Sequence, residues 1–578
     1  MNKIAFYPTH IEVTCDDDDT RQKLTAFYPM HINRKSTIYK MSLRKTLEVL
    51  KVLRNIDETN IDTAPPAVQE YFFKELNSRE NIADLLTYGP RHPCRISDRL
   101  TLGTHQELGR EIAWERDRFA FFFDTRTGKT PLSLTIIYDD LVRFGRQNKW
   151  LVVCPLILIE NAWLEDSAKF YPELTVINCH AATKEKRLQR MAQPAHIYVT
   201  NTESFVIYRK YFEQIGITCC IVDESSDMKS TKSKVSEELV DFAQRMKRFY
   251  LLSGTPAPNG EHEYYMQMRA IDKYSWQSSP TQFKEHFFVN LSHDSQYEKL
   301  YLRPDMKDEL YAKIKETAIF VDKADVLNLP GRDFKRVEYE MPTELMKHYR
   351  SMKSELYVEL NLHNETLGTL KIKAVSVAAK LNKLNQVSSG FIMDTAAVKE
   401  NYLYGTDKPE WYLLDRWRFN ALKDLLNTPD NAGQQVLIWA NYRREFELIV
   451  ETLGAANCRC VHGGINLDDK NEAIKLFKSG KIQYLIANPA SADKGLTLTN
   501  CHICVYFSLN WSYELFKQSY DRIYADKSIQ PHFCNYYIMI AKNTIDAILY
   551  DEVLAGKSTA SYSILNHLKP EALTGEGT

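Results

Sequence analysis

Residues 119–130 read FAFFFDTRTGKT, and this stretch decides the class of fold. An apolar run typical of a buried strand passes directly into a turn that ends in Gly128, Lys129 and Thr130, and a helical stretch follows. In such a turn the backbone N–H groups can cradle a phosphate, the lysine ammonium can reach its oxygens and the threonine hydroxyl can ligate Mg²⁺. Phe123 stands in place of the usual first glycine, so the prediction depends on the order of strand, turn and helix.

Short apolar runs alternate with amphipathic helical stretches in two blocks of the chain. Between about 100 and 270 the runs are FAFFF, WLVVCPL, HIYVT, CCIVD and FYLLSG, and beyond about 400 they are QVLIWA, RCVHG, YLIAN, HICVYFS and FCNYYIMIA. This alternation is typical of parallel sheets covered by helices. The sequence therefore predicts an α/β fold in which two lobes flank a helical insertion, preceded by a small N-terminal α+β module.

We expect five parts along the chain. These are an N-terminal module at 1–95 that selects the geometry of its partner, a first lobe at 96–270 that binds nucleotide, a helical insertion and linker at 271–415, a second lobe at 416–560 and a C-terminal tail at 561–578. The Pro65-Pro66 pair and the stretch GPRHPCR at 89–95 are the breaks that favour the first boundary.

The N-terminal module contains a short echo, AFYPTHI at 5–11 and AFYPMHI at 26–32, which predicts two equivalent strands. Phe6, Tyr7, Phe27 and Tyr28 can form a stacking platform for bases or pack in a core, and we favour the core because aromatic pairs on neighbouring strands commonly pack there. The acidic run at 16–19 is typical of a solvated turn, with a metal site as the alternative.

The composition excludes several classes of protein. The chain has 578 residues, 44% of them hydrophobic, and 74 Lys and Arg against 75 Asp and Glu give a net charge of −1. No window holds the roughly 18 uninterrupted apolar residues of a membrane helix, and the start MNKIAFYPTH lacks a secretory signal pattern. We therefore expect a cytoplasmic protein, in the host cytoplasm if the source is viral, whose contacts with any polyanion are local.

The cysteines do not favour a metal site. The chain has 11 of them, including Cys458 and Cys460, and Cys501 and Cys504. The second pair lies in NCHICVYFSL, which has the pattern of a buried strand, and a free thiol in an apolar run behaves as a small hydrophobic group. We expect buried thiols here rather than zinc.

A second motif, CCIVDESS at 219–226, ends an apolar run in Asp223 and Glu224. A carboxylate at a strand tip can hold the water shell of Mg²⁺, and its neighbour can orient and deprotonate an attacking water. The alternative is an acidic helix cap, with Asp223 as the N-cap residue and Glu224 in the first turn. Because the pair follows Lys129 within the same alternating block, hydrolysis of ATP is the leading hypothesis.

With these motifs in place, the chain resembles the Swi/Snf-type branch of the superfamily two helicases and translocases over about 100–560. The matching stretches are Gln106 for motif Q, DESS at 223–226 for motif II, LLSGTPAPN at 251–259 for motif III, VLIWANY at 436–442 for motif IV, SADKGLTLT at 491–499 for motif V and NWSYELFKQSYDRIYADKS at 510–528 for motif VI. FVDKADVLNLP at 320–330 is similar to the family's segment leading out of the first lobe. The resemblance implies two RecA-like parallel-sheet lobes that close around one ATP.

The resemblance also implies roles for individual residues. The catalytic residues would be Lys129, Asp223, Glu224, Gln518 and Arg522. The nucleotide would be held by Gln106 at the adenine edge, Thr127, Gly128, Lys129, Thr130 and Gly495, with Mg²⁺ at Thr130 and Asp223, while residues 253–255 would couple lobe closure to the phosphate state. The nucleic-acid strand would lie near Pro155, Thr200 and Thr499, with Lys229 from a basic cluster whose alternative is a solvated face.

One position departs from the family pattern. Family members usually carry a second arginine three positions after the first in motif VI, and this chain has Ala525 there. Arg522 alone suffices, or Lys527 substitutes from a shifted backbone, or hydrolysis is slow. The alternative for Arg522 itself is an exposed helix arginine in an i,i+4 pair, although its spacing of four from Gln518 favours the catalytic role.

The resemblance implies an ATP- and Mg²⁺-dependent translocase, acting as a monomer on double-stranded or branched DNA without reading its sequence. The small module before the motor is similar in layout to viral and phage fork remodellers and to annealing helicases. Two other functions stay open at this point: an RNA-dependent ATPase of the same superfamily, and a scaffold with a degenerate ATPase, for which Ala525 is the argument. No membrane partner is expected.

Overall fold

The structure is a computed structural model that describes residues 3–6, 11–14, 38–41, 66–92, 95–97, 99–273, 275–277, 279–291, 298, 300–355, 357–361, 369–373, 377–394, 410–491 and 497–555. The chain divides into two compact units, Met1–Leu327 with Ala560–Thr578, and Asn328–Thr559. No helix among the described residues is long and apolar enough to cross a membrane.

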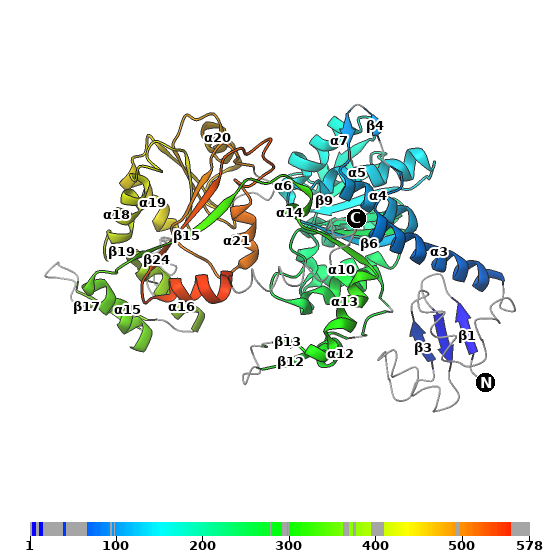
Figure 1. Cartoon of the computed structure of the whole chain (residues 1–578), viewed down its shortest axis with the longest axis horizontal. Coiled ribbons are helices and arrows are strands. Elements are labelled where there is room, and N and C mark those ends of the chain that lie inside the picture. Colours follow the sequence, from blue (N-terminus) through cyan, green and yellow to red (C-terminus); the bar gives the residue numbers. More distant parts are fainter. Residues whose placement is uncertain are drawn as a thin grey trace. The chain divides into compact units, whose positions relative to one another are not determined.

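The core of the first unit is a parallel sheet of seven described strands in the order β14-β6-β11-β10-β7-β9-β8. Figure 1 labels β6 and β9 of this sheet. All neighbouring strands in it are parallel. The strands are β6 Arg118–Phe123, β7 Trp150–Cys154, β8 Val176–Asn178, β9 Ile197–Asn201, β10 Cys219–Asp223, β11 Arg248–Leu252 and β14 Ala318–Val321. The five apolar runs predicted as strands of this lobe are therefore confirmed.

Helices cover both faces of this sheet, and this explains why its strands are apolar at almost every position. In β6 the side chains of Phe119, Phe121 and Phe123 join one apolar cluster, and those of Ala120 and Phe122 join another. The first cluster includes residues of α4 Thr104–Glu115 and α5 Lys129–Tyr138, and the second includes residues of α9 Thr202–Gln214, α10 Lys234–Ala243 and α11 Tyr264–Ile271.

The first lobe extends beyond the boundary expected at residue 270. Strand β14 pairs in parallel with β6, and its residues Ile319 and Val321 are buried in the same cluster as Phe121. The region expected as one helical insertion at 271–415 is therefore divided between the units, although it does contain helices. In the first unit these are α12 Pro280–Phe287, α13 Lys307–Lys315 and α14 Lys323–Val326, with a hairpin of β12 Phe288–Asn290 and β13 Leu300–Leu302.

The second unit is built on a parallel sheet of six described strands in the order β15-β24-β23-β20-β22-β21. The strands are β15 Arg332–Tyr339, β20 Val436–Trp439, β21 Cys458–Val461, β22 Tyr484–Ala487, β23 Ile503–Tyr506 and β24 Cys534–Ala541. All five predicted strands of the second lobe are present. Because β15 lies within 271–415, this lobe begins about eighty residues earlier than expected.

Helices again flank the second sheet. One apolar cluster contains residues of α18 Trp417–Leu426 and α19 Arg443–Leu453, and the other contains residues of α15 Thr343–Glu355, α16 Val377–Ser388, α20 Leu467–Lys478, α21 Tyr513–Tyr520 and α22 Ile545–Ile548. Two antiparallel hairpins accompany them, β16 Tyr357–Asn361 with β17 Thr369–Lys373, and β18 Phe391–Asp394 with β19 Glu410–Leu413. Cys504 lies in β23 and Cys501 shortly before it, and both are buried, as expected of apolar thiols.

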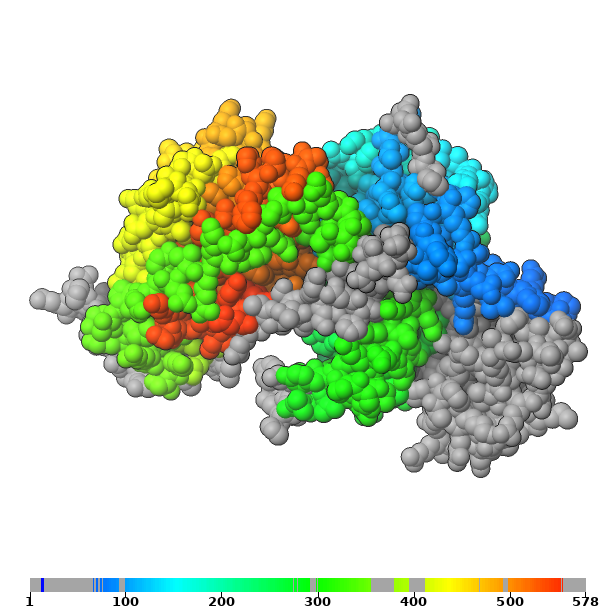
Figure 2. Space-filling view, viewed as in Figure 1, coloured from blue at the N-terminus to red at the C-terminus, as the bar shows by residue number. Residues whose placement is uncertain are grey.

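The N-terminal region divides earlier than residue 95. A three-stranded antiparallel sheet of β1 Lys3–Phe6, β2 Ile11–Thr14 and β3 Ile38–Met41 comes first. The helix α3 Pro66–Tyr88 then packs on the first lobe: Leu85 is buried in the cluster of α4 and α5, and the Ser78 hydroxyl donates to the carbonyl of Glu115 at 3.2 Å. Figure 2 shows α3 in blue at the surface. Its contacts place α3 with the first lobe, so the Pro65-Pro66 break marks the boundary.

Several expectations for this module lie outside the described residues. They concern the second copy of the echo at 26–32, the acidic run at 16–19 and the aromatic residues Tyr7, Phe27 and Tyr28. Phe6 is the last residue of β1.

Candidate active site

The predicted site residues of the first unit lie where its parallel strands end. The phosphate-loop stretch follows β6, Pro155 follows β7, Asp223 ends β10 and Ser253 follows β11. These strands are neighbours in the order β6-β11-β10-β7, and the carboxyl ends of parallel strands meet at one edge. The fold therefore brings together residues that are up to about 130 positions apart in sequence.

The loop between β6 and α5 has the conformation that a phosphate cradle needs. Arg126 and Gly128 both have positive φ, 65° and 81°, and Gly128 is the N-cap residue of α5. Gly128 has the left-handed backbone that favours glycine, and a Cβ atom there would lie 2.2 Å from Nε2 of Gln106 and would displace this side-chain amide. Backbone N–H groups at the start of α5 are therefore available to bind an anion.

Residues of α4 hold this loop from behind. Gln106 Nε2 donates to the carbonyl of Gly128 at 2.9 Å, and its Oε1 accepts from the N–H of Gly103 at 2.8 Å. A ring nitrogen of His105 lies 2.7 Å from the carbonyl of Thr127. The hydroxyl of Thr127 is buried and donates to the carbonyl of Asp124 at 2.7 Å, so its side chain shapes the loop. Gln106 is thus placed at the loop, and its contact with adenine stays a prediction.

Lys129 and Thr130 begin α5. The Lys129 ammonium donates to the carbonyls of Phe123 at 3.0 Å and Asp124 at 3.3 Å, so it lies within the curve of the loop. Thr130 is half-buried at the second position of the helix. The Asp124 carboxylate lies 3.9 Å from the ammonium of buried Lys323, in the segment that leads out of the lobe.

Asp223 and Glu224 form the acidic part of the site. Asp223 Oδ2 accepts from the indole N–H of Trp163 at 3.0 Å, and its Oδ1 accepts from the backbone N–H of Glu224 at 3.0 Å. Burial and the neighbouring Glu224 raise the pKa of Asp223 to about 6, while Lys129 and the Trp163 bond lower it. Because Lys129 acts electrostatically on Asp223, the cation and the carboxylate pair share one site.

The helix-cap alternative for this pair does not match the structure. The element that follows is a short 3₁₀ helix, Ser225–Met228, whose N-cap residue is Glu224 rather than Asp223. Glu224 makes no side-chain cap bond and has a positive φ of 55°, which is uncommon for a residue with a Cβ atom. Such backbone strain clusters at functional sites. The Glu224 side chain is half-buried.

The motif at 251–259 contacts both other motifs. A Cβ atom at Gly254 would lie 3.2 Å from the backbone N of Thr125, so the segment passes directly over the phosphate loop. The buried side chain of Gln267 on α11 accepts from the Ser225 hydroxyl at 2.8 Å and donates to the carbonyl of Pro256 at 2.6 Å. One glutamine thus joins the acidic motif to the segment that was expected to couple it to the phosphate state.

The residues of this site fit Mg²⁺-bound ATP. A left-handed glycine precedes a helix N-terminus, a lysine ammonium lies within the loop, and a buried carboxylate beside a second carboxylate favours a cation. Lys129 and the loop N–H groups would hold phosphate, and Thr130 and Asp223 would hold the metal or its waters. Among the described residues no group of three or more His, Cys, Asp or Glu side chains is placed to bind a metal by itself.

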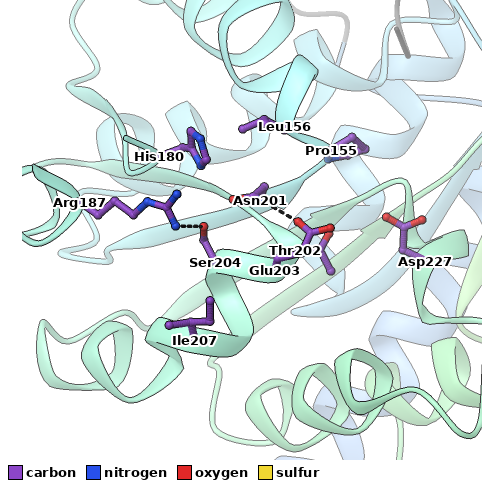
Figure 3. Close-up of a pocket in the computed structure, with 10 residues that line it drawn as sticks. All are labelled: Pro155, Leu156, His180, Arg187, Asn201, Thr202, Glu203, Ser204, Ile207 and Asp227. Carbon is purple, nitrogen blue, oxygen red and sulfur yellow. Dashed lines mark hydrogen bonds between the residues drawn. The ribbon is translucent and has the colours of Figure 1, made fainter. Parts of the chain in front are cut away.

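A pocket of about 480 Å³ lies at the same edge of the sheet (Figure 3). It contains the expected strand contact Pro155 but not Thr200, which is fully buried. The lining residues are Pro155, Leu156, His180, Arg187, Asn201, Thr202, Glu203, Ser204, Ile207 and Asp227. Asn201 and Thr202, at the N-terminus of α9, are therefore better placed to meet a strand than Thr200. Lys229 is half-buried and does not line the pocket.

In the second unit, Gln518 and Arg522 are both buried, but Arg522 lies beyond the end of α21 at Tyr520. Gln518 therefore lies on the helix and Arg522 in the turn that follows it, so the two do not form the expected pair on one helix. The carbonyl of Arg522 accepts from the N–H of Leu498 at 2.9 Å, which joins its turn to the segment of Thr499. Ala525 is buried and Lys527 is exposed. Gly495 lies outside the described residues.

The sequence did not reveal Trp163 and Gln267. Each contacts the acidic motif from more than forty positions away, and neither belongs to a residue class that signals catalysis. The available signal for Trp163 was its place in an apolar stretch shortly after Pro155, which by itself indicates only a core residue.

Comparison with known proteins covers most of the chain. Residues 38–389 match the family described as the SNF2-related domain, and residues 417–525 match the helicase conserved C-terminal domain. Protein p41 of Acyrthosiphon pisum secondary endosymbiont phage 1 is 24% identical over 73% of this chain and 89% of its own. The human DNA annealing helicase and endonuclease ZRANB3 is 22% identical over 87% of this chain.

The chain spans only 43% of the length of the human annealing helicase. Among solved structures, the Sulfolobus solfataricus SWI2/SNF2 ATPase core in complex with dsDNA aligns over 83% of this chain and 99% of its own, at 16% identity and a TM-score of 0.36.

Proposed function

We propose that this chain, which belongs to the SNF2-related family, is an ATP-driven translocase that acts on double-stranded or branched DNA. The family match covers more than half of the chain and makes it a nucleic-acid-dependent ATPase with helicase-like domains. The observation that carries the proposal is the joint placement of the phosphate loop, Lys129 and the Asp223–Glu224 pair at the edge of a sheet that also holds the pocket at Pro155.

The proposed chemistry is hydrolysis of the terminal phosphoryl bond. Mg²⁺ supplies charge neutralisation of the phosphates when it is bound. Lys129 and the N–H groups of the loop would orient the phosphates, and Asp223 would fix the metal's water shell. Glu224 would orient the attacking water and accept its proton. Arg522 of the second unit would neutralise charge that develops in the transition state.

We propose that the pocket beside this site contacts a DNA strand. Its wall contains the N-terminus of α9, where Thr202 is the first helical residue, and the guanidinium of Arg187, which donates to the Ser204 hydroxyl at 3.2 Å (Figure 3). Helix N-termini and guanidinium groups bind phosphates without reading bases. Such contacts suit a motor that moves along DNA of any sequence.

The printed names of similar proteins favour DNA over RNA as the partner of this chain. The printed names of the annealing helicase and of a mouse chromodomain-helicase-DNA-binding protein, 22% identical over 73% of this chain, refer to DNA. We also propose that the chain remodels forks or recombination intermediates, uses Mg²⁺-ATP and acts as a monomer.

The first prediction tests the reaction and its partner. We expect ATP turnover by the full chain to rise severalfold with duplex or forked DNA and much less with RNA. We also expect Glu224→Gln to bind ATP without hydrolysing it, because an amide can hold a water but cannot take its proton. Release of phosphate and binding of a fluorescent ATP analogue measure the two properties. Stronger stimulation by RNA would favour the RNA-dependent alternative, and no turnover under any condition would favour a scaffold. Loss of ATP binding in Glu224→Gln would contradict its catalytic role.

The second prediction concerns the N-terminal module. We expect a chain lacking residues 1–64 to keep DNA-stimulated turnover, because α3 and its contacts with α4 remain, and to lose preference among forks, junctions and plain duplex. Competition between these DNAs in the turnover assay measures the preference. A matched deletion of 1–95 should instead lower the unfolding temperature, since it removes the buried Leu85 and the backbone N–H groups of Arg91 and His92 that Glu111 accepts from. Equal preference before and after the shorter deletion would refute the role.

A further inference from the structure

One short segment of the first unit contacts both the strand pocket and the catalytic carboxylates. It consists of Pro155, α6 Leu156–Leu158 and a single π-helical turn, Ile159–Leu164. Pro155 and Leu156 line the pocket, and Leu156 is 50% exposed. At the other end of the segment, Trp163 is fully buried and donates its indole N–H to Asp223.

The Trp163 bond fixes the orientation of the Asp223 carboxylate. One oxygen of this group accepts from the indole at 3.0 Å and the other accepts from the N–H of Glu224 at 3.0 Å. The N–H of Glu224 belongs to the residue next to Asp223, so it moves together with Asp223. The indole is the donor that comes from another element, so it sets the rotation of the carboxylate relative to the rest of the site.

The segment is buried on one side and accessible on the other. Ile159 and Trp163 are fully buried in the cluster beneath α5, whereas Pro155 and Leu156 face the pocket. Strand β7, which leads into the segment, is hydrogen-bonded to β10, and Cys154 at its end lies close enough for Asp223 to help raise the pKa of its thiol. A displacement of the pocket wall would therefore move the indole against Asp223.

We propose that Trp163 is a positioning residue that links occupation of the pocket by a DNA strand to the orientation of Asp223. When a strand bears on Pro155 and Leu156, it holds the π-helical turn in place, and with it the indole N–H from which Asp223 accepts. Asp223, which would hold the metal's water shell, thereby keeps its orientation, and turnover rises with DNA. This inference rests on the proposed function, because it needs the pocket to hold a strand. Coupling of this kind travels through packed side chains and hydrogen bonds with two arrangements.

The chain provides a matched control for this tryptophan. Trp150, at the start of β7, is also fully buried and also donates its indole N–H to a buried aspartate, Oδ2 of Asp140, at 3.0 Å. This second pair lies at the amino end of the strand, whereas the pocket and Asp223 lie at carboxyl ends. Replacing either tryptophan with phenylalanine removes one indole N–H donor and leaves a smaller aromatic ring in the same apolar cluster.

The experiment compares Trp163→Phe and Trp150→Phe in the full chain. We expect the ratio of ATP turnover with duplex DNA to turnover without it to fall about fivefold or more in Trp163→Phe, the lower end of usual coupling factors, and to stay unchanged in Trp150→Phe. Binding of a fluorescent ATP analogue, titrated with Mg²⁺, is the second measurement. Trp163→Phe should need a severalfold higher Mg²⁺ concentration for half-maximal binding enhancement, since Asp223 is no longer oriented. Thermal unfolding of both variants shows whether each retains the fold.

Each result decides the proposal. An unchanged stimulation ratio in Trp163→Phe, or an equal fall in both variants, overturns it, because the effect would then be absent or a property of the core. If the wild-type chain shows no stimulation by DNA, the proposed function has failed instead. In that case the Mg²⁺ titration alone judges the positioning role, and an unchanged Mg²⁺ requirement in Trp163→Phe overturns it.

Discussion

Replacing Lys129 with alanine is expected to lower ATP turnover at least about a hundredfold, the usual cost of removing one group that stabilises transition-state charge. The fold should stay intact, because the ammonium donates to the loop carbonyls of Phe123 and Asp124 and Lys129 is not part of the apolar core clusters. Phosphate release measures the first effect, and thermal unfolding measures the second.

Lys149→Ala is the matched control for this substitution. The Lys149 ammonium also donates to a backbone carbonyl, that of Ile215 at 2.8 Å, but it is exposed and precedes β7 at the opposite edge of the sheet. Its loss changes charge and hydrogen bonding in the same way without touching the site. Turnover above about a tenth of wild type in Lys129→Ala would contradict the assignment of the phosphate loop.

The parts of the fold that could be predicted from sequence are those that local pattern determines. FAFFF and CCIVD are apolar at successive positions because helices cover both faces of their sheet, so strand, turn and helix could be recognised together. The phosphate loop could be placed for the same reason, since all its residues are contiguous. The short strand β14, four residues long, has no such context, and the boundary at 270 was wrong because pairing with β6 decides where it belongs.

The contacts that orient the site residues could not be predicted. The bond from Trp163 to Asp223 and the link from Ser225 through Gln267 join segments that only the folded sheet brings together. The motif comparison marked Thr200 as a strand contact, yet the alternation of β9 turns its side chain into the core and leaves Asn201 and Thr202 at the pocket. A motif thus identifies the strand end, and the register decides which side chain is accessible.

Arg522 is the residue of the second lobe with the largest expected effect on turnover. Arg522→Ala is expected to lower turnover by about 10³-fold or more with little change in ATP affinity, the effect of losing an arginine finger. Because Ala525 stands where the family has its second arginine, Arg522 should carry an unusually large share of this effect. Its turn is fixed from two sides: its carbonyl accepts from Leu498, and the buried amide of Gln530 donates to the carbonyl of Ile523 at 2.9 Å.

A second guanidinium in this unit gives the control. Arg332 on β15 lies over the ring of Tyr524, 4.6 Å from its centroid, and is held there by the aromatic side chains of motif VI. Arg332→Ala should lower the unfolding temperature through lost packing and leave most of the turnover. If Arg522→Ala is fully active, the alignment of motif VI is wrong.

The variant Ala525→Arg tests whether the missing guanidinium limits the rate of ATP hydrolysis. Ala525 is 4% exposed, so an arginine there must displace its neighbours at a cost of about 1–3 kcal/mol. Lys527 is exposed, and its backbone N–H is fixed at 2.7 Å to the carbonyl of Asn328, so a shifted backbone that brings it inward would first have to break this bond. We therefore expect Ala525→Arg to lower stability without raising turnover. A rise in turnover at unchanged stability would show that the site has room for the second arginine and that its absence slows hydrolysis in this chain.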